Sequence, residues 1–194
     1  MDKRQRILEA AELSFRLYGY KGTTMDQVAK LADVAKGTIY TFFKNKEELF
    51  DEILENLINV LKRKAESAID PNDSFFANLH RAIYEILEFR KQHQLTLKLS
   101  QEVRDIGTTK ASAALDKVER AILAFIERYI GKAIKKGEII PCDPRKTAFI
   151  MLKIYIALVF EWEMKNEAPL SEEEIAGLFD QFIALGLKPR KAAE

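Results

Sequence analysis

Residues 21–50 restrict the fold of this chain more than any other stretch of its sequence. Thr24 stands three residues before Gln27, a spacing at which each of the two side chains bonds the main-chain N–H of the other at the start of a helix. Apolar residues then follow with helical spacing, at Met25, Val28, Ala29 and Ala32. The sequence therefore predicts a short amphipathic helix that begins after Thr24.

A second short helix is predicted after a tight break. Asp33 and Val34 interrupt the first helix, and Gly37 loosens the entry to a helix that residues 38–41 begin. The outward positions of this second helix are small, polar or aromatic rather than acidic, so its surface is able to enter a major groove of DNA. Together the two helices form a predicted helix-turn-helix.

The chemistry of the side chains around this motif divides its expected DNA contacts into two kinds. Thr24, Tyr40 and Lys46 are expected to hold phosphate oxygens. The residues expected to approach base edges are Lys36, Gly37, Thr38 and Thr41. The complete set of candidate DNA-binding residues is Thr24, Lys36, Gly37, Thr38, Tyr40, Thr41, Lys44 and Lys46.

About the first fifty residues resemble the TetR family of bacterial transcriptional repressors. The matching features are the Gly-Tyr exit of the first helix, the Thr that opens the second, and the run from Lys36 to Tyr40 with Phe43, Lys46 and Leu49 after it. Three positions depart from the common pattern, where Asp33 replaces a usual Gly, Ala35 a frequent capping Ser, and Phe42 a frequent His or Tyr. Asp tolerates the left-handed conformation better than most residues. The missing cap is expected to cost roughly 1 kcal/mol of helix stability.

Composition agrees with a cytoplasmic regulator that carries a small DNA-binding head on a larger body. The chain has 194 residues, 47% of them hydrophobic, which is enough to bury a full core. Residues 2–6 are charged and no apolar signal segment follows them, so we expect no secretion signal. Cys142 is the only cysteine, which excludes an intramolecular disulfide and favours a reducing compartment.

The net charge of +1 is distributed unevenly along the chain. Residues 1–50 carry nine Lys and Arg against seven Asp and Glu, a balance of +2, and the remainder carries 22 against 23, a balance of −1. The head is therefore only mildly basic. Such a charge suits modest non-specific DNA affinity, with much of the selectivity left to base contacts.

The rest of the sequence predicts helices only, and the expected fold is all-α with nine helices. The division expected from the sequence is a helix-turn-helix DNA-binding domain over residues 1–47 and a helical ligand-binding and dimerisation domain over residues 48–194. The predicted helices of the body cover approximately residues 45–68, 75–93, 95–107, 115–137 and 145–166, with a last helix from Ser171 and a solvated tail from Lys188 to Glu194.

Residues 148–160 form an apolar run that is too short, and too interrupted by Lys153, to span a bilayer. No membrane partner is expected, and this run is predicted to be a buried helix with one face left for a second subunit. Phe179 and Phe182 of the last helix are placed either in the subunit core or in such a dimer interface. In the TetR family the last two helices pair with their symmetry mates, which implies a homodimer here.

The apolar helices of the body are expected to enclose an elongated cavity for a hydrophobic small-molecule effector rather than to close completely. The candidate ligand-binding residues are Phe76, Ile83, Leu87, Arg90, Leu99, Val103, Arg104, Phe125, Tyr129, Met151, Tyr155 and Trp162. Arg90, Arg104 and Lys98 are placed to meet an anionic head group. The stretch 101–105 and the region of Trp162 resemble fatty-acid-responsive members of the family, which implies a fatty acyl chain or its coenzyme A thioester, with a flat hydrophobic drug or dye second.

No catalytic, metal or cofactor site is predicted. His80 and His93 are thirteen residues apart, without an i+4 partner, and are expected at the surface or at helix ends. Two alternatives to a ligand-responsive, non-enzymatic repressor remain open. One is a DNA-binding regulator controlled by protein contact, which a filled body would support. The other is a helical enzyme, which a buried cluster of Arg90, Glu102, Arg104 and Asp105 would support.

Overall fold

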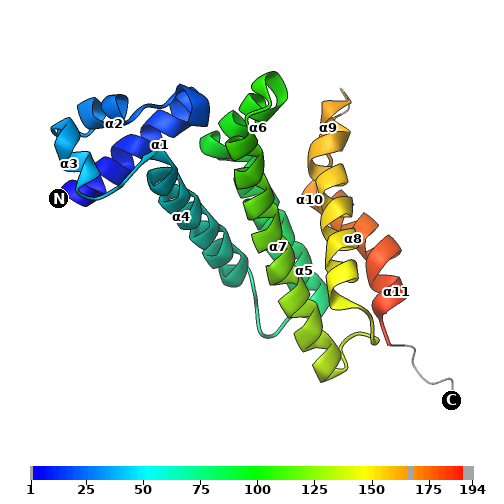
Figure 1. The fold of residues 1–194 in the computed structure, drawn as a ribbon. Coiled ribbons are helices and arrows are strands. Elements are labelled where there is room, and N and C mark those ends of the chain that lie inside the picture. Colours follow the sequence, from blue (N-terminus) through cyan, green and yellow to red (C-terminus); the bar gives the residue numbers. More distant parts are fainter. Residues whose placement is uncertain (1, 166–167, 190–194) are drawn as a thin grey trace, which may run out of the picture. The chain divides into compact units, whose positions relative to one another are not determined.

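The computed structural model describes residues 2–165 and 168–189, and their regular structure is entirely helical. Over these residues the chain forms nine helices, as expected from the sequence, because each of the last two helices is made of three consecutive segments. Figure 1 shows the helices in their order along the chain. The tail expected from Lys188 onward lies largely outside the described residues, since only Lys188 and Pro189 of it are included.

The first three helices form the predicted helix-turn-helix head. They are α1 (Lys3–Gly22), α2 (Met25–Leu31) and α3 (Lys36–Tyr40). Thr24 and Gln27 make both bonds of the capping box at the start of α2. Asp33 in the turn has a φ of 51°, the left-handed conformation for which Asp is suited. Ala35 precedes α3 without a side-chain cap, as its methyl group requires.

Four longer helices follow the head. They are α4 (Lys46–Ser67), α5 (Phe75–Gln92), α6 (Gln94–Ile106) and α7 (Thr109–Lys136). Asn45 begins α4 by accepting a hydrogen bond of 2.8 Å from the N–H of Glu48. Gly107 ends α6 with a φ of 72°, a left-handed conformation that glycine adopts without steric cost.

Each of the last two helices contains one π-helical segment. The first is made of α8 (Pro144–Ile156), η1 (Ala157–Glu161) and α9 (Trp162–Met164), and Asp143 caps its start. The second is made of α10 (Glu172–Phe179), η2 (Asp180–Ala184) and α11 (Leu185–Leu187), and it opens with a capping box between Ser171 and Glu174. None of the helices in the described part of the chain is long and apolar enough to cross a membrane.

Contacts divide the chain into two compact units. The first combines residues 1–60 with residues 92–118, and the second combines residues 61–91 with residues 119–194. This division differs from the boundary after residue 47 that the sequence predicts, because α6 packs along α1 and so belongs with the head. Helices α4 and α7 continue from one unit into the other.

The core of the second unit shows whether Phe179 and Phe182 are buried, and it also places His80. Phe179 is 2% exposed and packs against Tyr155, with ring centroids 5.1 Å apart, whereas Phe182 is 67% exposed. Phe179 is therefore a residue of the subunit core. His80 is buried with them, and its Nδ1 lies 2.6 Å from the Tyr155 hydroxyl. The expectation that His80 lies at the surface is wrong, because its ring fills space between α5, α8 and α10.

Candidate DNA-binding interface

Helix α3 and the residue after it present most of their candidate DNA-binding side chains to solvent. Lys36, Gly37, Tyr40 and Thr41 are exposed and Thr38 is half-buried, while Ile39 between them is fully buried. The buried Ile39 side chain holds α3 on the head and leaves the opposite side of the helix free. Tyr40 is 47% exposed, so its phenol is available outside the head.

Lys36 is paired within the motif before any DNA is bound. Its ammonium group lies 2.7 Å from a carboxylate oxygen of Asp26 on α2, and this hydrogen bond raises the pKa of Lys36. Both side chains are more than half exposed. Surface pairs of this kind contribute little to stability. Lys36 is therefore able to exchange the carboxylate for an acceptor on DNA.

The hydroxyl groups of two candidate threonines form hydrogen bonds with main-chain groups of the motif. The N–H of Gln27 donates a hydrogen bond of 3.2 Å to the Thr24 hydroxyl at the start of α2. The Thr41 hydroxyl donates one of 2.7 Å to the carbonyl of Thr38 at the end of α3. Both side chains are exposed and retain hydrogen-bonding capacity on the outer side.

Lys46 has an additional role that the sequence did not predict. Its Nζ donates hydrogen bonds to the carbonyl of Tyr20, at 2.9 Å, and to that of Thr23, at 3.0 Å. It also lies 4.3 Å from the centre of the Tyr20 ring. An ammonium group has three donors, so one remains for a phosphate. Lys44 differs from Lys46 in being exposed.

Arg6 on α1 supports the turn of the motif, and local sequence patterns gave no signal for it. Its guanidinium donates to the carbonyls of Ala32, at 2.6 Å, and Asp33, at 3.1 Å, and it lies 3.4 Å from the Asp33 carboxylate. These contacts join residues 26 or more positions apart. They hold the turn between α2 and α3, and therefore the angle between these two helices.

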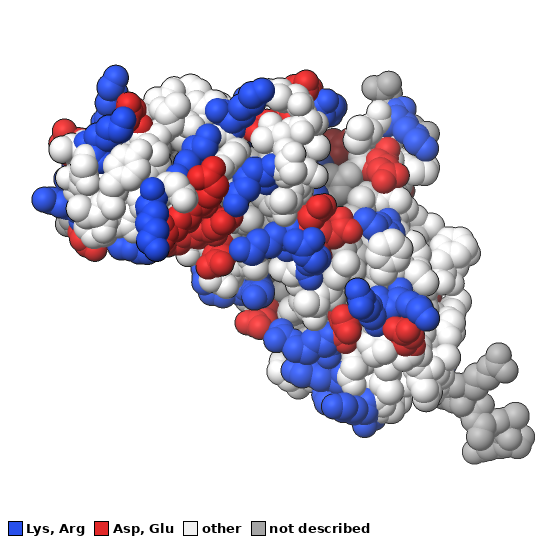
Figure 2. All heavy atoms as spheres, in the orientation of Figure 1, with Lys and Arg blue, Asp and Glu red and all other residues white. Residues whose placement is uncertain are grey.

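Charge is mixed rather than concentrated on the face drawn in Figure 2. Basic and acidic side chains alternate there, without one continuous basic area. This mixture agrees with the small positive balance of +2 over residues 1–50.

The candidate ligand-binding residues are divided between the two units. Leu99, Val103 and Arg104 on α6 belong to the first unit, and the other nine belong to the second. Ile83, Leu87, Leu99, Phe125, Met151 and Tyr155 are buried, Phe76, Arg90, Val103 and Tyr129 are half-buried, and Arg104 and Trp162 are exposed. Within the second unit the rings of Phe125 and Tyr129 stack, with centroids 5.6 Å apart. The elongated cavity stays a prediction.

The cluster that would have supported an enzyme does not form as a buried group. Glu102 is 5% exposed, but the Arg104 and Asp105 side chains are 66% and 68% exposed. Among the residues that the structure describes, no three His, Cys, Asp or Glu side chains lie together in a way that would hold a metal ion.

Sequence relatives agree with the geometry of the head. Residues 7–53 match the family model for bacterial regulatory proteins of the tetR family. The uncharacterized HTH-type transcriptional regulator YhgD of Bacillus subtilis (strain 168) is 56% identical over 187 residues, which cover 96% of this chain and 97% of the relative. A likeness of this extent reaches well beyond the DNA-binding head.

Solved structures of the same fold cover nearly the whole chain. The fatty acid degradation regulator FadR from Bacillus halodurans has a TM-score of 0.66 at 20% identity, covering 93% of this chain and 94% of its own. AibR, in complex with isovaleryl coenzyme A and operator DNA, has a TM-score of 0.59 at 23% identity, covering 93% and 97%. The chain therefore belongs to the TetR family, and it is a helix-turn-helix transcriptional regulator rather than an enzyme.

Proposed function

We propose that the chain is a cytoplasmic repressor that binds a palindromic operator as a homodimer and leaves it when a hydrophobic effector binds. The observation that carries the proposal is the exposed surface of α3, where Lys36, Gly37 and Tyr40 face solvent on a helix held by buried Ile39. Selection of duplexes from genomic DNA, followed by titration of the recovered operator, tests it. Binding that does not discriminate between the recovered operator and random duplex would contradict it.

Exposed apolar side chains on the last two helices support the homodimer. The large ones are Phe149, Ile150, Trp162, Met164, Phe182 and Leu185. Exposed apolar residues scattered singly are ordinary, whereas apolar residues gathered on one part of a surface mark an interaction site. Sedimentation velocity at micromolar concentration tests the dimer, and a single species of monomer mass would contradict it.

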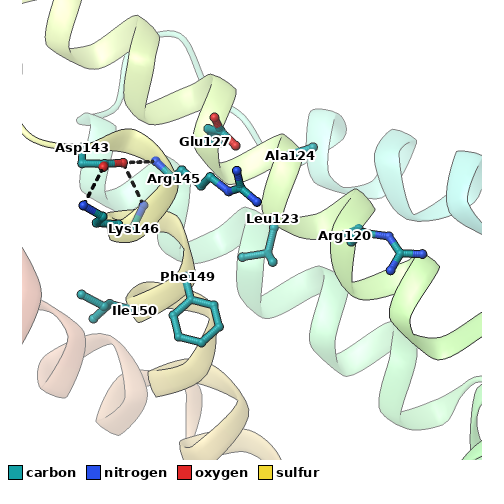
Figure 3. Close-up of a pocket in the computed structure, with 9 residues that line it drawn as sticks. All are labelled: Arg120, Leu123, Ala124, Glu127, Asp143, Arg145, Lys146, Phe149 and Ile150. Atoms are coloured by element: carbon teal, nitrogen blue, oxygen red, sulfur yellow. Dashed lines mark hydrogen bonds and ion pairs between the residues drawn. The ribbon is translucent and has the colours of Figure 1, made fainter. Parts of the chain in front are cut away.

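A surface groove of about 950 Å³ lies beside part of this apolar surface (Figure 3). Leu123 and Ala124 of α7 line it together with Phe149 and Ile150 of α8, and Arg120 and Arg145 lie at it as well. None of the twelve candidate ligand-binding residues lines this groove. We assign it to the subunit interface rather than to the effector.

For the effector we propose a fatty acyl chain, carried as the free acid or as its coenzyme A thioester. The many buried apolar side chains of the second unit suit a long hydrocarbon. Arg90 lies over the Phe160 ring at 5.7 Å, and burial lowers the pKa of its guanidinium. A half-buried cation among apolar side chains suits an anionic head group. Two structural neighbours support this class of effector, because FadR is a fatty acid degradation regulator and AibR binds isovaleryl coenzyme A.

Release requires that the effector prefer one conformation of the repressor, because equal affinity for two conformations shifts nothing. Helix α4 belongs to both units, so a tilt of α4 changes the position from which each head meets its groove. A tenfold loss of operator affinity needs only about 1.4 kcal/mol of differential binding.

Titration of acyl-coenzyme A species of several chain lengths into the operator complex tests the effector. Release that depends on chain length is the expected result. Release by flat aromatic drugs alone would favour the second class of ligand. No release by any small molecule would favour control through protein contact.

A further inference from the structure

A buried carboxylate joins α6 to the end of α1. Glu102 is 5% exposed, and its Oε1 accepts a hydrogen bond of 3.1 Å from the main-chain N–H of Lys21. The other oxygen, Oε2, is buried and has no hydrogen-bond partner among the described residues. An incompletely satisfied buried carboxylate is costly, so its presence calls for an explanation.

The backbone of α1 leaves space for this carboxylate at Gly19. Gly19 has a φ of 74°, which interrupts the helical conformation of α1, and a Cβ at this position would collide with Oε2 of Glu102. Only glycine combines the left-handed conformation with the missing side chain. Gly19 and Glu102 therefore fit each other as a pair, although 83 positions separate them in the sequence.

The segment held by Glu102 leads directly into the DNA-binding motif. The Thr23 hydroxyl donates a hydrogen bond of 2.8 Å to the carbonyl of Gly19, and Thr24 then caps α2. Lys46 holds the carbonyls of Tyr20 and Thr23 from α4. The corner at residues 19–23 is thus fixed by a cation from α4 on its carbonyl groups and by an anion from α6 on its N–H group.

We propose that Glu102 is a positioning residue, through which α6 sets the orientation of the helix-turn-helix for an operator with two half-sites. The inference rests on the proposed function. It adds to that function one specific contact, which Glu102 makes with Gly19 and with the N–H of Lys21 and which we call the joint. The joint is releasable because one carboxylate oxygen is unsatisfied. An adjoining groove of about 320 Å³, lined by Lys21 and Lys98 as well as by Glu102, gives the carboxylate charged partners once it leaves Gly19.

The test compares Glu102→Ala with the wild type on two duplexes, one with both half-sites and one with a single half-site. Loss of the joint is expected to weaken the two-site duplex about tenfold and the single-site duplex less than about threefold, because each head stays intact while its orientation is lost. Glu102→Gln keeps an oxygen acceptor for Lys21 and is expected to restore most of the affinity. Asp116→Ala removes an exposed carboxylate of α7 in the same unit, outside this groove, and serves as the control.

Equal weakening of both duplexes by Glu102→Ala, or no weakening of either, would overturn the inference while leaving the proposed function intact. A wild-type protein that prefers no duplex would overturn both.

A double-mutant cycle provides a second measurement if Glu102→Ala is poorly folded. Gly19→Ala is expected to weaken the two-site duplex, in part through the collision with the carboxylate. In the Glu102→Ala background that collision is absent, so the double variant should bind better than the product of the two single effects. Effects that multiply independently would show that Gly19 and Glu102 do not act as a joint.

Discussion

The ammonium group of Lys46, the first residue of α4, lies 2.9 Å from the carbonyl oxygen of Tyr20 near the end of α1. The same residue is a candidate for the phosphate backbone. Its substitution is therefore expected to change the stability of the head as well as its affinity for DNA.

Lys46→Ala is expected to lower the free energy of unfolding by about 1.5 to 3 kcal/mol, the usual contribution of a hydrogen bond to a charged group. It should also weaken binding to all DNA sequences nearly alike. Lys44→Ala is the matched control, because it removes an exposed lysine of the same head. Lys44→Ala should reduce the slope of log affinity against log salt concentration by about one, and it should leave the thermal midpoint nearly unchanged. Equal thermal midpoints of the Lys46→Ala and Lys44→Ala variants would contradict the structural role of Lys46.

Thr38→Ala is expected to change the preference among operators rather than the overall affinity for DNA. Thr38 is half-buried on the outer side of α3, where a hydroxyl is able to distinguish base edges. A selection from operators randomised at each position would show relaxed preference at one or two base pairs, each contributing about 1 to 3 kcal/mol. An unchanged sequence preference would remove Thr38 from the set of base-reading residues.

Substitution of Phe179 is expected to lower the stability of the subunit, whereas substitution of Phe182 is expected to weaken the dimer. Phe179→Ala should destabilise the subunit by about 3 to 5 kcal/mol, because it leaves a cavity beside Tyr155. Phe182→Glu should instead give a folded protein that dissociates and loses two-site operator binding. Thermal melting separates the first effect, and sedimentation velocity separates the second. A dimeric Phe182→Glu variant would exclude this residue from the interface.

Stability is expected to fall as the pH decreases below about 6.5. Burial lowers the pKa of His80 below its ordinary value, and the charge of Arg81 adds to this effect. Burial lowers the pKa of His93 as well. A base with a lowered pKa in the folded state binds its proton more readily when unfolded, so the stability present above pH 6.5 is lost as acid is added.

Thermal midpoints measured between pH 7.5 and 5.5 test this dependence. His80→Gln removes the titrating group and keeps a side chain that can hydrogen-bond the Tyr155 hydroxyl. The fall in midpoint should therefore be smaller for this variant than for the wild type. An identical fall would assign the acid sensitivity to other groups.

The sequence by itself determined the elements of this protein and the nature of its head. The capping pair Thr24 and Gln27, the Asp-Val break and the helical spacing of apolar residues are local signals, and each acts over one or two helical turns. For that reason the number and approximate positions of the nine helices, and the surface that α3 presents, were predictable. The starts were less exact, since α7 begins at Thr109 rather than near residue 115, and α3 begins at Lys36 rather than at residue 38. The exposed position of Tyr40 followed from the same spacing.

Only the tertiary structure decided which distant residues meet. Arg6 on the turn at Asp33, Lys46 on the carbonyl of Tyr20, and Glu102 against Gly19 all join positions far apart in the chain. Helical spacing gives the faces of a helix, but it does not say which face packs on which neighbour. Phe179 and Phe182 illustrate this limit, since both lie on one apolar stripe and only packing against Tyr155 placed the first in the core. Burial of a side chain depends on the whole set of neighbouring helices, and a local pattern contains no record of that set.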